Sequence, residues 1–141
     1  MVFQVRGRAM TLSNIFLRLA VIFAIVGIGL GAWMGGSGDH ALMGVHAHIN
    51  LLGWVSMFLY GLFYRVLPQA ASGLLPKIHA WTAIGGFVIF MPALAVVLSG
   101  NAGLAGIAEI GLMAGPLLIM IGMILFAVIV FGATGKARPA A

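Results

Sequence analysis

Four long apolar stretches, separated by short polar breaks, limit what this chain can fold into. They cover about residues 15–33, 41–67, 78–98 and 107–131. Each reaches the ~20 residues that an α-helix rising ~1.5 Å per residue needs to cross a ~30 Å hydrocarbon core. Only 6% of the residues are charged, whereas a soluble domain has about 25% charged residues. We therefore expect an all-α integral membrane protein.

The breaks at about 35–39, 69–76 and 100–103 are short and contain glycine or proline. Such residues favour turns, and short links place consecutive helices antiparallel to each other. The sequence therefore predicts one domain, residues 1–141, built as an antiparallel bundle of four transmembrane helices.

The basic residues predict the orientation of these helices. All seven lie near the termini or beside the second break: Arg6, Arg8, Arg18, Arg65, Lys77, Lys136 and Arg138. The acidic residues Asp39 and Glu109 lie at or near the other two breaks. Because cytoplasmic segments carry the excess of Lys and Arg, we expect both termini in the cytoplasm. The net charge of +5 does not indicate nucleic-acid binding, since the basic residues form no cluster.

The chain has no cysteine, so any metal or cofactor must be held by nitrogen, oxygen or thioether ligands. Three histidines, His40, His46 and His48, lie where the second stretch begins. His79 begins the third stretch at the opposite end, ~30 Å away along the helix axis.

His46 and His48 are two residues apart, which on an α-helix rotates one side chain about 200° from the other. They cannot chelate one metal ion while both are helical. The His46 face continues with Asn50, Gly53, Met57, Gly61 and Tyr64, which are mostly small or weakly polar, whereas the His48 face is bulky and apolar. Neutral imidazole is a good ligand for haem iron. The structural alternative is that the glycines only pack helices together and the histidines are hydrogen-bonded or solvated.

The segment HAHINLLGWVSMFLYGLFYRVLP, residues 46–68, resembles the tenth transmembrane helix of the catalytic subunit of haem-copper oxidases. The likeness is greatest to C-type oxidases and nitric oxide reductases. The next segment, LPKIHAW at 75–81, resembles the start of the eleventh helix of that subunit. The matching residues are His46, His48, Gly53, Trp54, Gly61, Tyr64 and Pro68. The resemblance covers roughly a third of the chain.

This resemblance implies b-type haem. In the family, the first histidine of the pair binds the high-spin haem and the second binds the low-spin haem, so these roles fall on His46 and His48. The residues expected around the cofactor are Asn50, Gly53, Trp54, Met57 and Gly61. The three histidines that hold copper in the family come from helices with no counterpart here. Copper could join the site, but the sequence offers no full ligand set for it.

The family core contains twelve helices in three arcs of four, and this chain has the length of one arc. A homotrimer would rebuild the ring, because head-to-tail interfaces that close give cyclic oligomers. His48 of one subunit and His46 of its neighbour would then clamp one low-spin haem at each interface. We therefore expect a homo-oligomer, most simply a trimer.

The leading hypothesis is a multi-pass electron-transfer haem protein of a bacterial-type inner (cytoplasmic) membrane, with a quinol or periplasmic redox partner. One alternative is a reduced oxidase or nitric oxide reductase-like enzyme with haem and copper. Another is a non-catalytic gas sensor or accessory subunit.

Three further residues are secondary candidates. His40 is expected in solvent or at a metal-entry site. His79 is expected to hydrogen-bond a haem propionate, a lipid phosphate or the backbone. Glu109 is expected to cap the fourth helix or to act as a proton partner at the haem edge.

Overall fold

The computed structural model describes the backbone of residues 2–135 and the side chains of residues 11–135. Every regular element in this part of the chain is helical, and four stretches are long and apolar enough to cross a membrane. The predicted all-α fold with four spans is therefore confirmed. The elements are α1 (Val2–Ser37), α2 (Met43–His48), η1 (Ile49–Ser56), α3 (Met57–Val66), η2 (Pro68–Ala71), α4 (Leu75–Leu98), η3 (Ala102–Leu104) and α5 (Ala105–Thr134).

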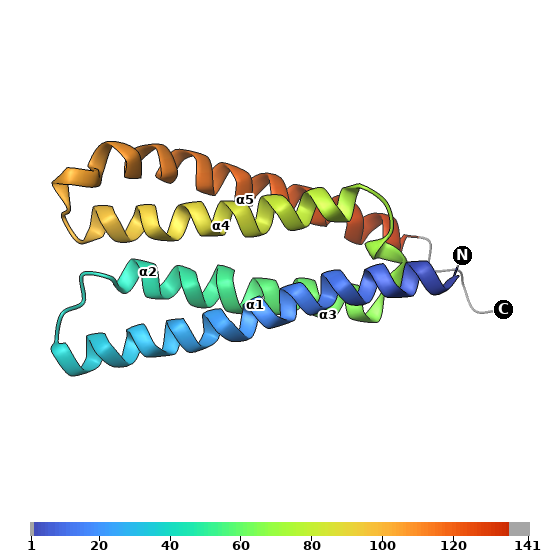
Figure 1. Ribbon diagram of the computed structural model, residues 1–141, viewed down its shortest axis with the longest axis horizontal. Helices are drawn as coiled ribbons and strands as arrows, with labels where there is room; N and C mark the ends of the chain where they lie inside the picture. Colours follow the sequence, from blue (N-terminus) through green and yellow to red (C-terminus); the bar gives the residue numbers. More distant parts are fainter. Residues whose placement is uncertain (1, 136–141) are drawn as a thin grey trace.

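The helices form two antiparallel hairpins that lie side by side (Figure 1). One hairpin joins α1 to the continuous second span, α2–η1–α3, and the other joins α4 to α5. α4 begins at Leu75, three residues before the expected start, because Pro76 lies in its first turn, where a missing backbone N–H costs nothing.

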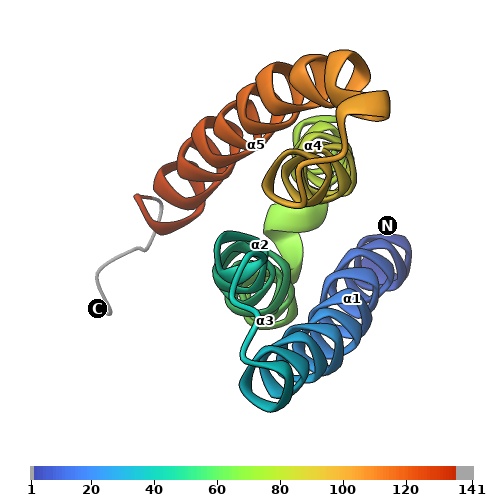
Figure 2. The same cartoon turned by 90° about the vertical axis from the view of Figure 1, so that its left-hand side faces the viewer.

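Seen along the helix axes, the four spans form a row (Figure 2). The row closes toward the η2 link, where Phe16 of α1 and Phe126 of α5 both pack on His79 of α4. The second span lies between α1 and α4, and α5 packs mainly on α4. Away from the η2 link, α1 and α5 therefore occupy the two ends of the row. Each keeps a broad apolar face exposed, as Ile25 and Ile28 of α1 and Ile110 and Met113 of α5 illustrate.

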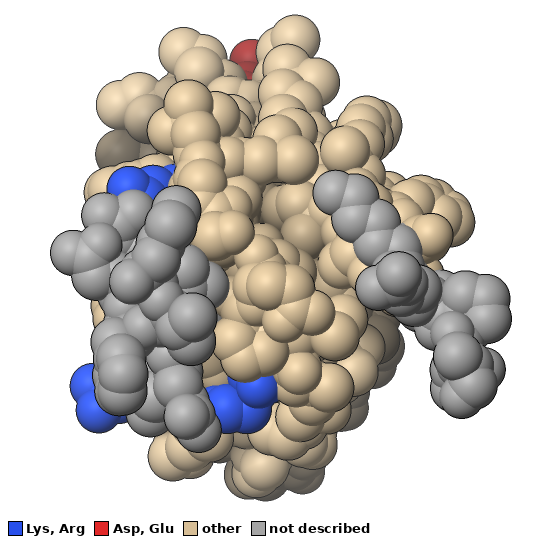
Figure 3. All heavy atoms as spheres, turned by 90° about the vertical axis from the view of Figure 1, so that its right-hand side faces the viewer, with Lys and Arg blue, Asp and Glu red and all other residues tan. Residues whose placement is uncertain are grey.

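The start of α1 and the end of α5 lie at the same end of the molecule as the η2 link. Figure 3 shows basic side chains on this end face. The side chains of Arg6 and Arg8, and all of Lys136 and Arg138, lie outside the described residues. The links that contain Asp39 and precede Glu109 lie at the opposite end.

The sequence predicts one uniform α-helix for the second span. The structure differs, because residues Ile49–Ser56 form a π-helix directly after His48. In this wider helix the backbone bonds run over five residues, and the Ser56 hydroxyl likewise donates to the Leu51 carbonyl at 2.8 Å. A Cβ at Gly53 would lie 2.7 Å from Phe87 of α4 and 2.9 Å from Phe23 of α1. Glycine thus lets the π-helix fit between both neighbours.

The α4–α5 hairpin depends on close backbone contact at glycines. A Cβ at Gly115 would lie 2.6 Å from the Cβ of Phe90, and one at Gly111 would lie 2.7 Å from the Cβ of Ala93. Small residues four apart are a common means of bringing membrane helices together, because apolar packing against lipid alone gives little preference for a helix partner.

Candidate functional site

His46 is half-buried between the second span and α1. Its Nδ1–H donates to the carbonyl oxygen of Gly27 at 2.9 Å. Gly31 makes room for the ring, because a Cβ at that position would lie 2.7 Å from the His46 Cε1. The Asn50 amide donates to the His46 carbonyl oxygen at 2.9 Å. The contacts with Gly27 and Gly31 fix the orientation of the imidazole.

His48 lies on the side of the second span that faces α4. Its Nδ1–H donates to the Gly44 carbonyl oxygen, one turn earlier, at 2.7 Å. The ring meets Phe90 of α4 with 5.2 Å between centroids and an interplanar angle of 89°. The two histidines are thus directed to different neighbouring helices, as the rotation along the helix predicts.

In both histidines a backbone carbonyl holds the proton on Nδ1, so the lone pair is left on Nε2. Metal-binding histidines are usually fixed by this kind of bond from the other ring nitrogen. Among the described side chains, neither Nε2 is enclosed without a partner, so both reach the surface of the subunit. Since the rings diverge, one haem plane cannot have both as axial ligands within a single subunit.

The other predicted cofactor residues mostly pack helices together. Gly53, Met57 and Gly61 are buried, and a Cβ at Gly61 would lie 2.8 Å from the Leu17 side chain of α1. Asn50 is half-buried and contacts Gly27. Trp54 is 41% exposed on the outer surface of the span. The structure therefore does not bring Trp54 together with the other four residues.

The secondary candidates do not form a cluster. His40 is exposed in the first link, where its Nδ1 donates to the Gly38 carbonyl oxygen at 2.9 Å. Glu109 is exposed and lies beyond the first turn of α5, which contains no acidic residue, so the prediction that Glu109 caps this helix is wrong. Over the residues that the structure describes, no three His, Asp or Glu side chains come close enough to hold one metal ion.

The position of His79 at the start of a span suggested a contact with lipid or backbone. The structure instead places His79 in the protein core. It is 0% exposed, and its ring lies between Phe16 and Phe126, with centroid distances of 5.4 and 5.1 Å. The Tyr64 hydroxyl is hydrogen-bonded to its Nδ1 at 2.9 Å. Its Nε2 is buried without a hydrogen-bond partner. His79 is therefore a core residue with one of its two ring nitrogens hydrogen-bonded.

We expect Tyr64→Phe to destabilise the protein by about 1–3 kcal/mol, because both nitrogens of the buried His79 would then lack a partner. Tyr60→Phe is a matched control: the Tyr60 ring also packs on His79, at 4.7 Å, but its hydroxyl donates only to the Met123 sulfur at 3.8 Å. Thermal unfolding in mild detergent measures both variants. Equal losses in the two would contradict the importance of the Tyr64–His79 bond.

A polar contact that the sequence did not reveal joins α1 to the end of the second span. Arg65 donates from Nε to the Ser13 hydroxyl at 3.2 Å and from Nη2 to Asn14 Oδ1 at 2.6 Å. The buried Ser13 hydroxyl donates in turn to the Gly61 carbonyl oxygen at 2.9 Å. Arg65 thus has a structural role besides any role in orientation.

Comparison of the chain with protein-family models, curated proteins and solved structures found no match, so its function is inferred from the residues described above.

Proposed function

We propose that this protein is a membrane b-type cytochrome that binds haem through the Nε2 atoms of His46 and His48. One observation carries the proposal: each Nδ1–H is held by a backbone carbonyl, at 2.9 and 2.7 Å, which leaves each Nε2 free to bind iron. The likeness of residues 46–68 to a haem-binding helix supports the same assignment. Bound haem would supply one-electron transfer chemistry.

The surroundings of the two imidazoles suit a rigid ligand site. The Gly27 carbonyl oxygen accepts a hydrogen bond from the His46 Nδ1–H, and the absent side chain at Gly31 leaves room for that ring beside α1. The Phe90 ring packs perpendicular to the His48 ring and limits its rotation. Such supporting contacts orient metal-binding histidines, and their loss commonly lowers metal affinity 10–100-fold.

The divergence of the two rings favours haem that is shared between subunits. In lipid, a surface imidazole nitrogen without a partner is unfavourable, and a neighbouring subunit can remove this cost by completing the site. The exposed apolar faces of α1 and α5 are available for such contacts. We propose a homo-oligomer, with a trimer as the simplest ring that matches the resemblance.

We further propose that the protein lies in a bacterial-type inner membrane with both termini in the cytoplasm. The haem would then lie near the outer surface, within reach of a quinol or a periplasmic redox protein. The charge distribution supports this orientation: one end is basic and contains Arg65 and Lys77, whereas the acidic residues lie at the opposite end.

Because the chain has no cysteine, single substitutions can test the orientation. Ser37→Cys places a thiol at the exposed end of α1, and Ser72→Cys places one in the exposed link before α4, at the opposite end of the molecule. In intact cells, a membrane-impermeant maleimide should label Ser37→Cys and should label Ser72→Cys only after the membrane is permeabilised. The reverse pattern would show that the histidine pair lies on the cytoplasmic side.

The absorbance spectrum of the purified protein, oxidised and reduced, tests the main proposal. Six-coordinate haem with two histidines should give sharp low-spin bands that carbon monoxide does not change. A high-spin spectrum that shifts with carbon monoxide would favour gas chemistry instead. The absence of a Soret band after expression with ample haem would overturn the proposal.

A mass measurement of the haem-loaded species in mild detergent tests the assembly. Haem-loaded monomers would exclude ligands that are shared between subunits.

A further inference from the structure

A groove lies between α1 and α4 at the basic end of the molecule. Its volume is about 340 Å³, within the ~300–1,000 Å³ of ligand sites. Lys77 is the charged residue of its lining, and every other lining residue is apolar. The lining residues are Leu12, Ile15 and Leu19 of α1 and Lys77, Ala80, Trp81 and Ile84 of α4. We call this feature the α1–α4 groove.

The groove has a direction. α4 starts at the basic end and runs toward the opposite end, so Lys77 lies at the mouth of the groove and Ile84 lies deeper. Trp81 is 80% exposed beside the mouth, as is common for tryptophan at a membrane interface. A charged mouth and an apolar interior match an amphiphile whose head group lies at the surface and whose hydrocarbon chain extends inward.

The charge balance indicates the sign of the head group. The sequence has only two acidic residues, Asp39 and Glu109, and both lie near the other end. In the described part of the chain, Arg65 is hydrogen-bonded to Ser13 and Asn14, whereas Lys77 makes no hydrogen bond to another side chain. Its ammonium group therefore requires water or an anion from outside the protein.

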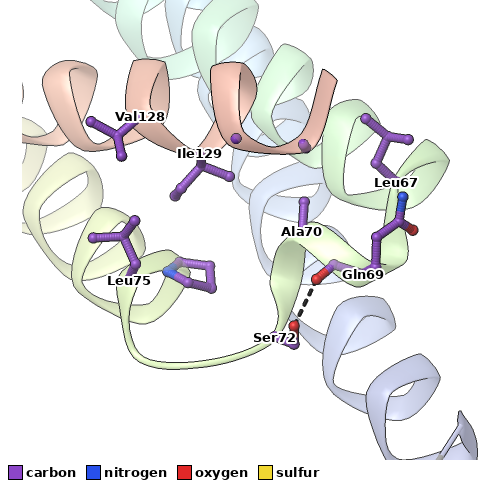
Figure 4. Close-up of a pocket in the computed structure, with 10 residues that line it drawn as sticks. Leu67, Gln69, Ala70, Ser72, Leu75, Val128 and Ile129 are labelled. Carbon is purple, nitrogen blue, oxygen red and sulfur yellow. Dashed lines mark hydrogen bonds between the residues drawn. The ribbon is translucent and has the colours of Figure 1, made fainter. Parts of the chain in front are cut away.

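Two other hollows show why the α1–α4 groove is distinctive. The larger one, of about 760 Å³, lies between η2 and the ends of α4 and α5 (Figure 4). Its polar lining consists of Gln69 and Ser72, and the Ser72 hydroxyl donates to the Gln69 carbonyl oxygen at 2.7 Å. Another, of about 480 Å³, lies between α4 and α5 and is lined by apolar residues. Neither lining contains a charge that would select a head group.

We propose that the α1–α4 groove binds an anionic phospholipid of the adjacent leaflet. Lys77 contacts the phosphate of its head group, and the apolar lining holds part of an acyl chain. Basic pockets between transmembrane helices are suited to such head groups, and each lysine near an anionic membrane surface contributes about 1 kcal/mol. This corresponds to about a fivefold preference over a zwitterionic lipid.

Native mass spectrometry of the protein in mild detergent tests this site, with phosphatidylglycerol and phosphatidylcholine of equal chain length as probes. We expect the wild-type protein to retain phosphatidylglycerol about fivefold better and Lys77→Gln to lose that preference. Arg18→Gln is the control, because it removes the same charge from an exposed side chain of α1 that does not line the groove. It should keep the preference.

A second variant tests the acyl-chain part of the site without changing its charge. Ile15→Trp should fill the groove from its exposed edge, since Ile15 is 41% exposed, and should lower the retention of both lipids. Equal retention of the two lipids by the wild-type protein, or an unchanged preference in Lys77→Gln, would overturn the proposal. Displacement of the lipid by soluble glycerol phosphate would also overturn it, because it would indicate a site for free phosphate. A cross-link from Ile15→Cys to a second copy of the chain would overturn it as well, because the groove would then be a contact between subunits.

Discussion

His46→Gly and His48→Gly subunits are each expected to lose low-spin haem, with haem affinity reduced at least roughly tenfold. Loss of a supporting contact to a ligand alone commonly costs 10–100-fold, and these variants remove an axial nitrogen outright. The haem bound per subunit, measured as the pyridine haemochromogen, reports occupancy, and the visible spectrum reports the loss of six-coordination. Normal haem content in both variants would contradict the ligand assignment.

His40→Gly is the matched control for these variants. His40 also donates from Nδ1 to a nearby carbonyl oxygen, at 2.9 Å, but it lies exposed in the first link. Its loss should leave the spectrum unchanged. Free imidazole should restore low-spin bands to His46→Gly and His48→Gly, because it can occupy the space that the missing ring leaves. A variant that had lost its fold would not respond to imidazole.

Co-expression of the two variants tests whether one haem takes ligands from two subunits. In a ring where each interface uses His48 of one subunit and His46 of the next, about one quarter of the interfaces in a random equal mixture are intact. The mixed protein should therefore regain about a quarter of the wild-type low-spin haem. If both ligands came from the same subunit, mixing would restore none.

The sequence predicted the four spans correctly because membrane crossing depends on local length and apolarity. It could not predict how these spans pack on one another. In lipid, the faces toward protein and toward hydrocarbon are both apolar, so hydropathy does not show which helices touch. Gly115 illustrates this point: its importance is clear only once Phe90 of α4 is seen against it.

The candidate site could be predicted only in part. The divergence of His46 and His48 follows from helical rotation, and the structure directs them toward α1 and α4. The π-helix at Ile49–Ser56 was missed because apolar periodicity does not show a change in backbone bonding. The surroundings of His79 were missed because Phe16 and Phe126 come from distant parts of the chain. Only the tertiary fold brings these rings together.

Gly115→Leu is expected to give the largest loss of stability, above about 3 kcal/mol, since overpacking of a tight core contact by even small groups costs 1–3 kcal/mol. The obstacles include the Cα and backbone nitrogen of Phe90, 2.8 and 2.9 Å from the added Cβ, and backbone atoms cannot rotate away. Gly132→Leu is the control on the same helix, because no atom lies within 4 Å of a Cβ there. Gel filtration and thermal unfolding in mild detergent should show a severe defect in Gly115→Leu alone.

A smaller change at the same position links helix packing to the histidine site. The Phe90 side chain contacts both Gly115 and the His48 ring, so a methyl group at Gly115 must displace the residue that positions His48. Gly111→Ala adds the same group one turn away against Ala93, at 2.7 Å. Both alanine variants should lose about 1–3 kcal/mol of stability, but only Gly115→Ala should also reduce haem occupancy or alter the low-spin spectrum. Equal spectra in the two would show that Phe90 does not position His48, because the packing defect would then act on stability alone.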